Sequence, residues 1–361
     1  LEYCMIIDMK IMVVQSYQSL LCNLLIIGGG LVFSGSVLGD IPVTERAALA
    51  ALYDGTGGPY WTRNDNWMSE DPCIQKWFGV NCNNRGIIIA VKLGRNNLTG
   101  TVPSEIIQLS TVKSLDLRTN SLAGSVLSEF GLMTKLLHLT LSSNQLSGSL
   151  PVELGQSSSL QSLLFDDNEL SGSLSPEIVL MPALVSLYMR NNLLNGSIPS
   201  EIGRSTSLSS IYLERNRLSG TIPSALGQTT FLRYLFLSEN LNLSGTIPTE
   251  IALMTSLRRL ALSDNHITGT IPRNFGYLRE LDWLNVDNND LVGSIPSELG
   301  WLSKLTYLHL KQNTLEGEVP TWICDIRNYD LRNNNFTCPL PTCCSGYYGN
   351  GYCAPCSQDY A

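Results

Sequence analysis

The stretch LRRLALSDNHITGTIPRNFGYLRE, residues 257–280, is one unit of a pattern that recurs along most of the chain. Across the units the consensus is Leu-x-x-Leu-x-Leu-x-x-Asn-x-Leu-x-Gly-x-Ile-Pro, followed by a second apolar turn. The asparagine returns every 24 residues, with one step of 25, at Asn96, Asn120, Asn144, Asn168, Asn192, Asn216, Asn240, Asn265, Asn289 and Asn313. A fixed period of this size predicts a solenoid, because each unit buries its apolar face only by stacking on its neighbours.

The period divides the chain into four segments. We expect a targeting segment at 1–39, an N-terminal cap at 40–87, ten 24-residue repeats at 88–325, and a truncated repeat with a Cys-rich cap at 326–361. The Leu-x-x-Leu-x-Leu stretch predicts a short strand, and strands of successive repeats should pair about 4.8 Å apart in a parallel, concave sheet. We expect the recurring asparagine to bond backbone groups as a structural ladder. The predicted fold is an α/β solenoid, a horseshoe or superhelix with capped ends.

Composition and charge narrow the class of protein. Hydrophobic residues make up 43% of the chain and charged residues 15%, which predicts a folded and not a disordered protein. The formal net charge is −8. No nucleic acid partner is expected, since that would need a basic stripe, and an anionic membrane surface is an equally poor match.

The first 39 residues are typical of a targeting segment. No charged residue lies between Lys10 and Asp40, and the run contains LLCNLLIIGGGLVFSGSVLG. Small residues favour cleavage near 36–39, as in a signal peptide, whereas the length of the apolar run leaves an uncleaved signal anchor as the alternative. Either interpretation predicts extracellular repeats, in a protein that is secreted or anchored in the plasma membrane.

The cysteines support the same compartment. Two of the ten, Cys4 and Cys22, fall in the targeting segment. The other eight lie at the ends of the array: Cys73, Cys82, Cys324, Cys338, Cys343, Cys344, Cys353 and Cys356. Such a distribution indicates disulfide-bonded caps, with a zinc site in the C-terminal cap as the less favoured alternative. Four sequons are candidate glycosylation sites: Asn97, Asn195, Asn242 and Asn335.

The segments NLTGTVP, NQLSGSLP, NRLSGTIP and NDLVGSIP resemble the plant-type leucine-rich repeat. That repeat occurs in the ectodomains of receptor-like kinases and receptor-like proteins, and in polygalacturonase-inhibiting proteins. Residues 45–82 resemble the N-terminal cap of the same family, through Cys73, Trp77, Gly79, Val80 and Cys82. The resemblance implies a capped solenoid that recognises another molecule.

On this basis we expect two defined disulfides. Cys73–Cys82 should close the N-terminal cap, and Cys324–Cys338 should tie the last repeat to the truncated one. The remaining four cysteines would pair among themselves in one of three connectivities.

The register of the repeat predicts which side chains face water. Counted from the first residue of the Leu-x-x-Leu-x-Leu stretch, positions 3, 5, 7 and 8 point out of the concave sheet. Repeats five to ten place six large rings at positions 3 and 5: Tyr188, Tyr212, Tyr234, Phe236, Trp283 and Tyr307. Four acids stand beside them: Glu214, Glu239, Asp264 and Asp287. We expect this face to bind a cationic or amphipathic protein or peptide. The alternative is that the rings stack along the sheet and only stabilise it.

Catalysis is not expected. The three histidines, His138, His266 and His309, fall in repeats three, eight and ten, so no nucleophile–base–acid cluster can form around them. His309 shares its column with Asp330, with which we expect a surface ion pair. An open sheet also lacks the pocket that shifts catalytic pKa values. We therefore predict no enzyme, no metal site and no small-molecule cofactor.

The predicted function is recognition of a protein or peptide ligand on the concave face, in receptor-like signalling or defence. A membrane co-receptor is a possible second partner. The alternatives are a secreted inhibitor of cell-wall-degrading enzymes and a structural wall or adhesion protein.

Overall fold

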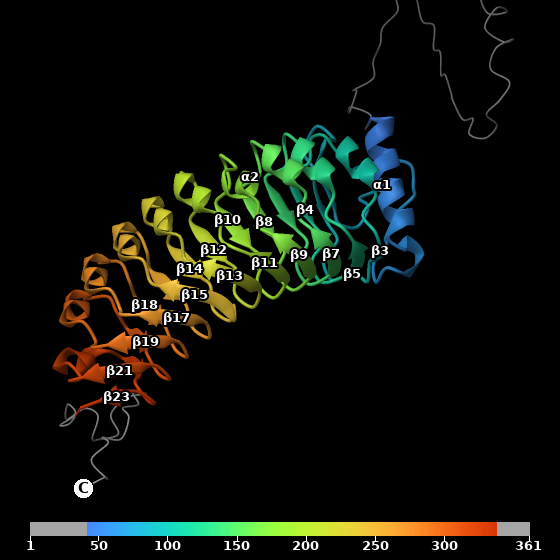
Figure 1. The fold of residues 1–361 in the computed structure, drawn as a ribbon. Coiled ribbons are helices and arrows are strands. Elements are labelled where there is room, and N and C mark those ends of the chain that lie inside the picture. Colours follow the sequence, from blue (N-terminus) through green and yellow to red (C-terminus); the bar gives the residue numbers. More distant parts are fainter. Residues whose placement is uncertain (1–41, 338–361) are drawn as a thin grey trace, which may run out of the picture. The chain divides into compact units, whose positions relative to one another are not determined.

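The computed structural model describes residues 42–337, which form one array of stacked repeats behind a helical cap (Figure 1). The predicted targeting segment and the cysteines from Cys338 onward lie outside the described residues. Within the array, each repeat contributes a strand to one sheet, a strand to a second sheet, and a short helix that leads into the next repeat.

The N-terminal cap is built from helix α1 (Val43–Gly55), the short helix η1 (Gly58–Tyr60) and strand β1 (Val80–Cys82). Four rings from these parts and their loops pack with centroids 4.8–5.7 Å apart: Tyr53, Trp61, Trp67 and Trp77. The Cys73–Cys82 disulfide is present, with the two Cα atoms 5.7 Å apart. The cap covers the first repeat's exposed strand edge, since β1 pairs antiparallel with the next strand.

Twelve strands of the described chain form the predicted concave sheet, in chain order. After β1 they are β2 (Ile88–Lys92), β4 (Ser114–Asp116), β6 (His138–Thr140), β8 (Ser162–Leu164), β10 (Ser186–Tyr188), β12 (Ser210–Tyr212), β14 (Tyr234–Phe236), β16 (Arg259–Ala261), β18 (Trp283–Asn285), β20 (Tyr307–His309) and β22 (Asn328–Asp330). From β2 onward the pairing is parallel, and equivalent residues of successive repeats lie opposite one another. The prediction of a parallel solenoid sheet is confirmed.

A second, eleven-stranded sheet follows the Asn-x-Leu-x-Gly part of each repeat. Its strands are β3 (Thr99–Gly100), β5 (Ser121–Gly124), β7 (Gln145–Ser149), β9 (Glu169–Ser173), β11 (Leu193–Gly196), β13 (Arg217–Thr221), β15 (Asn242–Thr246), β17 (His266–Gly269), β19 (Asp290–Gly293), β21 (Thr314–Gly317) and β23 (Asn335–Phe336). Every strand of this sheet except β23 contains a glycine with a positive φ; at Gly245 φ is 76°, and an added Cβ would lie 2.7 Å from the Thr221 methyl carbon. That position requires glycine both for its backbone conformation and for close stacking of the repeats.

Short helices close each repeat on the side away from the second sheet (Figure 1). They are η2 (Ser104–Gln108), η3 (Ser128–Leu132), η4 (Val152–Gln156), α2 (Pro176–Val179), η5 (Ser200–Arg204), η6 (Ser224–Gln228), η7 (Thr249–Leu253), η8 (Arg273–Tyr277), η9 (Ser297–Trp301) and η10 (Thr321–Asp325). In most repeats proline directly precedes the helix, whereas in the fourth Pro176 is its first residue, and there alone the turn is α-helical. A small sequence change thus alters the local helix type and leaves the repeat intact.

The recurring asparagine is a structural ladder, as predicted. The Asn216 side-chain amide donates to the carbonyls of Leu213 (3.1 Å) and Met189 (2.9 Å), while its oxygen accepts from the Leu194 N–H at 3.0 Å. The same pattern recurs along the array, for example at Asn240, which is fully buried. Each asparagine therefore satisfies backbone groups of its own repeat and of the repeat before it, where the chain leaves the strand.

Candidate ligand-binding face

The sheet register brings the predicted ring positions side by side. At position 5, Tyr188 lies opposite Tyr212, which lies opposite Phe236. At position 3, Trp283 lies opposite Tyr307. Tyr234 is also at position 3, opposite Arg259. All six predicted rings are half-buried on the concave sheet, so the predicted gathering of aromatic side chains on one face is present.

Five of these rings and one imidazole form a continuous stack, which we call the aromatic ladder: Tyr188, Tyr212, Phe236, Trp283, Tyr307 and His309. Successive ring centroids are 4.3, 4.6, 5.7, 4.7 and 3.9 Å apart. The ladder crosses from position 5 to position 3 at repeat eight. There, position 5 holds the small, buried Ala261, and Arg259 pairs with Asp282 at 3.4 Å. Phe236 and Trp283 therefore meet across an intervening strand.

Stacking determines what the ladder can present to a ligand. Three neighbouring pairs are stacked at 9–20° from parallel and cover part of each other's faces. The other two pairs are tilted, Tyr188 by 58° against Tyr212 and Phe236 by 31° against Trp283. Ring edges and tyrosine hydroxyls are left to form the outer surface, and ring edges carry a partial positive charge. Burial, the largest cause, raises the pKa of Tyr212 to about 12, so this hydroxyl remains protonated. The stacking that the alternative interpretation requires is therefore present, and it coexists with an outward-facing apolar edge.

Three of the four predicted acids are already engaged by their own neighbours. Glu239 accepts from the Arg215 guanidinium at 2.8 Å. Asp264 accepts from the Asn288 side chain at 2.8 Å. Asp287 is buried and accepts from the backbone N–H of Lys311 at 2.8 Å. These side chains are on the predicted face, but each already accepts a hydrogen bond from a neighbouring group of the protein.

The fourth acid, Glu214, differs from the others. Its Oε2 atom is buried, and no donor within the described residues bonds to it. Burial is the main cause that raises the pKa of Glu214 to about 7, against smaller opposing effects of its own backbone N–H, of Arg190 and of Arg215. Burial likewise raises the pKa of Asp166 to about 6, although Asp166 accepts from the Arg190 N–H at 3.0 Å. Asp166 was not among the predicted site residues; its place two repeats before Glu214 in the position 7 column was the available signal. The expectation that an open sheet leaves pKa values unshifted is wrong for these two acids, because partial burial raises the pKa of each.

The C-terminal end of the ladder contains a polar cluster. The His309 Nδ1 atom lies 2.9 Å from the Tyr307 hydroxyl and 3.3 Å from Asp287 Oδ2, and Nε2 lies 3.3 Å from the Asn328 oxygen. The expected His309–Asp330 ion pair is wrong in its partner: Asp330 is opposite His309 in the sheet, but its carboxylate bonds to Arg332 at 2.7 Å. Arginine competes better because its guanidinium is always charged and binds the carboxylate with two N–H groups.

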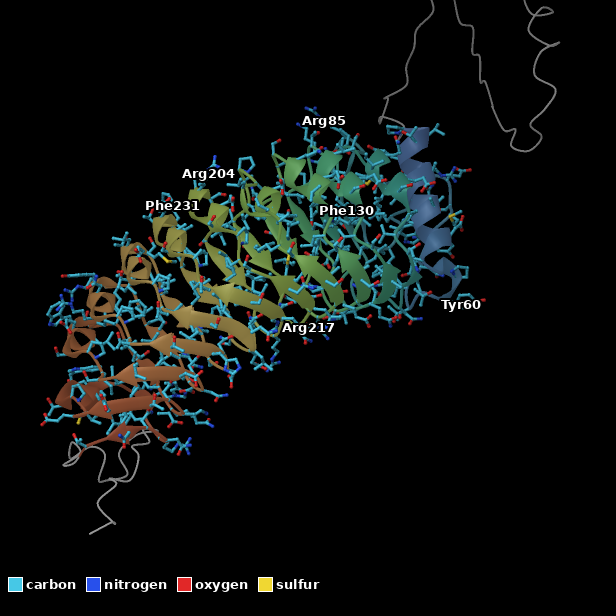
Figure 2. The ribbon with its side chains drawn as sticks, viewed as in Figure 1. Tyr60, Arg85, Phe130, Arg204, Arg217 and Phe231 are labelled. Carbon is cyan, nitrogen blue, oxygen red and sulfur yellow. A yellow bond between two sulfur atoms is a disulfide. The ribbon has the colours of Figure 1, made fainter. Side chains whose placement is uncertain are left out.

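A second row of exposed apolar side chains was not predicted from the sequence. Leu253, Tyr277 and Trp301 end three successive short helices and are 59%, 59% and 51% exposed, and Phe231 is 62% exposed. In Figure 2, Phe231 lies at the edge that carries the short helices, and Arg217 lies at the opposite edge. The sequence feature that could have revealed this row is the last residue of each short helix. The prediction considered only the strand positions of the concave sheet and so did not include it.

The remaining predicted sites have mixed outcomes. Cys324 is disulfide-bonded, and its expected partner Cys338 lies outside the described residues, as do Cys343, Cys344, Cys353 and Cys356. The four sequon asparagines, Asn97, Asn195, Asn242 and Asn335, are all exposed, and their glycosylation stays a prediction.

In residues 42–337, no three or more His, Cys, Asp or Glu side chains gather in a way that could hold a metal ion. None of the helices in that range has the length and apolar character needed to cross a membrane.

Comparison with known proteins agrees with the repeat geometry. Leucine-rich repeat family models match residues 206–267, and also 135–157, 183–205 and 304–326. The chain is a leucine-rich repeat protein. A curated relative, a probable leucine-rich repeat receptor-like protein kinase from Arabidopsis thaliana, is 41% identical over 56 residues, which is 16% of this chain and 6% of the relative.

Solved structures extend the similarity to receptor ectodomains. The Arabidopsis receptor kinase HAESA, in complex with the peptide hormone IDA and the co-receptor SERK1, has a TM-score of 0.69 and 30% identity over 83% of this chain and 55% of its own. The plant peptide hormone receptor RGFR1, in complex with RGF2, has a TM-score of 0.58 and 31% identity over 69% of this chain and 44% of its own. A plant ice-binding protein shares the fold at 24% identity, with a TM-score of 0.69 over 89% of this chain and 99% of its own. The chain spans about half the length of the two receptors.

Proposed function

We propose that this leucine-rich repeat protein is an extracellular recognition protein that binds a protein or peptide ligand along its aromatic ladder. The observation that carries the proposal is the ladder itself, a continuous file of rings over repeats five to ten on a sheet that faces water. Aromatic side chains are enriched where proteins bind one another, because they bury a large area with few rotatable bonds.

Similarity to receptors of known ligand supports the same role. The HAESA structure contains the peptide hormone IDA and the co-receptor SERK1, and the plant peptide hormone receptor RGFR1 is in complex with RGF2. By analogy, the ligand of this protein would be a peptide or an extended segment of a protein, and a membrane partner would transmit the signal. The open face also fits binding better than catalysis, because His138, His266 and His309 lie on separate repeats.

The test is capture of ligand by the full chain, expressed for export and immobilised. An extracellular peptide fraction and a set of cell-wall-degrading enzymes are offered separately, and bound material is identified by mass spectrometry. We expect a peptide to be retained, and to be lost when Trp283 is replaced by alanine. Retention of a wall-degrading enzyme, with loss of that enzyme's activity, would instead support the inhibitor function.

A further inference from the structure

The unpaired carboxylate beside the ladder suggests the chemistry of the ligand. Glu214 lies two residues after Tyr212, just past the end of β12, at the outward-facing position 7 of its repeat, so both side chains belong to the concave face. Its neighbours in the same column are Arg190 on one side and Ser238 on the other, because the backbone N–H of Arg215 bonds to Ser238 and that of Asn191 bonds to Glu214. Glu214 is therefore placed directly along the first half of the ladder.

The two nearest arginines are held by other acids. Arg215 bonds to Glu239 at 2.8 Å, and Arg190 lies 3.9 Å from Asp167. Among the described residues, no cationic side chain lies within ion-pair distance of Glu214. A buried carboxylate oxygen without a donor destabilises the free protein, and a cation supplied from outside would remove that cost.

We propose that Glu214 is the charge anchor of the ladder, and that the ligand carries a lysine or arginine whose head group pairs with it. The inference rests on the proposed function, since it names the ligand chemistry of the same face. The aliphatic stem of the incoming side chain would lie along the outer edges of Tyr188 and Tyr212, in the way long cationic side chains cover apolar surface. Glu214 as a residue is partly exposed, so an incoming head group can approach its carboxylate from the water side.

An ion pair, and not a cation–π contact, is the expected attraction. Tyr212 and Phe236 stack face to face, with centroids 4.6 Å apart and planes 9° from parallel, whereas Tyr188 is tilted by 58° against Tyr212. A cation is attracted to a ring face and repelled by a ring edge, and the facing sides of the stacked Tyr212 and Phe236 are covered. At this pair the attraction for a cation therefore comes from the nearby carboxylate.

The same geometry makes binding depend on pH. Glu214 must be ionised to pair with a cation, and its pKa is raised to about 7 by burial. The charged or titratable groups that act on this part of the face are Asp166, Arg190, Arg215, Tyr188, Tyr212, Tyr234 and Arg259. Asp166, the one carboxylic acid in this list, has a pKa of about 6, so it ionises over a slightly lower pH range than Glu214. Affinity for a cationic ligand should therefore rise between pH 5.5 and 8.

The experiment uses the full chain and two synthetic probes, acetyl-Gly-Arg-Gly-amide and the same peptide with citrulline, which has the shape of arginine without its charge. Binding is followed by NMR titration at pH 5.5, 7 and 8. We expect the arginine peptide to bind at least about tenfold more tightly than the citrulline peptide at pH 8, with the advantage reduced at pH 5.5. Glu214→Gln should abolish that advantage, and Glu214→Asp should retain part of it.

Asp116→Asn is the matched control, because it removes one charge from the same sheet but from a carboxylate already paired with Arg118 at 3.4 Å, four repeats away from Glu214. Equal binding of the two peptides to the unaltered protein would overturn the inference. So would equal losses in Glu214→Gln and Asp116→Asn, which would indicate general attraction to an acidic surface. If the captured ligand is lost with Trp283→Ala but kept with Glu214→Gln, the proposed function stands and this inference fails.

Discussion

The first four repeats and the following six share one scaffold and differ in the surface that they carry. Both halves bury the same leucine columns and the same asparagine ladder in the same register. At position 5 the first half presents Lys92, Asp116, Thr140 and Leu164, whereas the second half begins with Tyr188, Tyr212 and Phe236. Because a solenoid is held together by contacts between adjacent repeats, its water-facing positions can change without loss of the fold. The difference between the halves therefore points to function.

The strongest test of the shared scaffold is the removal of one asparagine from each half. Asn144→Ala and Asn240→Ala each leave several backbone groups without partners, including the N–H of Leu122 or of Leu218. We expect each change to lower the free energy of unfolding by about 3 kcal/mol. Urea unfolding followed by circular dichroism measures this. A large loss in one half with none in the other would show that the two scaffolds are not equivalent.

The ladder is tested by substitutions that should affect binding in one half only. Trp283→Ala and Tyr212→Ala should each weaken binding of the captured ligand at least about tenfold, since a buried aromatic anchor typically contributes about 2 kcal/mol. His138→Ala and Thr140→Ala, on the first half, should change affinity less than twofold. Titration calorimetry compares the four variants. Unfolding of the aromatic variants, with affinity kept in the folded fraction, would mean that the stack only stabilises the sheet.

Glu214 gives the second half a contribution to stability that depends on pH. Glu214 has a pKa of about 7 in the folded protein, above its ordinary value of 4.5, so between these values the folded state holds a proton that the unfolded state has lost. The stability that Glu214 contributes is therefore present at low pH and is lost as the pH rises through about 7. After allowance for solvent screening, the free energy of unfolding should fall by about 1 kcal/mol over this range. The stability of Glu214→Gln relative to the unaltered protein should therefore increase as the pH is raised from 5 to 8. An unchanged difference in urea midpoint would contradict this assignment.

The smallest effect is expected at the exposed ion pair between Arg215 and Glu239. Both side chains are well exposed, at 61% and 44%, and pairs of this kind contribute less than about 1 kcal/mol. Glu239→Gln should shift the unfolding midpoint only slightly, and even less in high salt. A large shift at low salt would show that this pair is part of a wider charge network.

The success of the sequence predictions varied with the kind of contact that each required. The strand register, the asparagine ladder and the Cys73–Cys82 disulfide follow from a local pattern repeated at a constant spacing. His309 was placed in the correct column but assigned the wrong partner, because two acids lie within reach and geometry selects between them. The exposed row that includes Trp301 was missed, because the helical edge has no two-residue alternation to reveal it.

The period and the side-chain alternation within each strand are properties of the chain itself. Together they are enough to place Tyr212, Glu214 and Trp283 on one face, since side chains in a strand alternate and repeats stack in register. Only the folded molecule decides how neighbours on that face divide their contacts. The small Ala261 lets the ladder cross a strand, and Arg215 turns to Glu239 and leaves Glu214 without a cation. These outcomes depend on rotamers and burial between repeats, which a one-dimensional pattern does not specify.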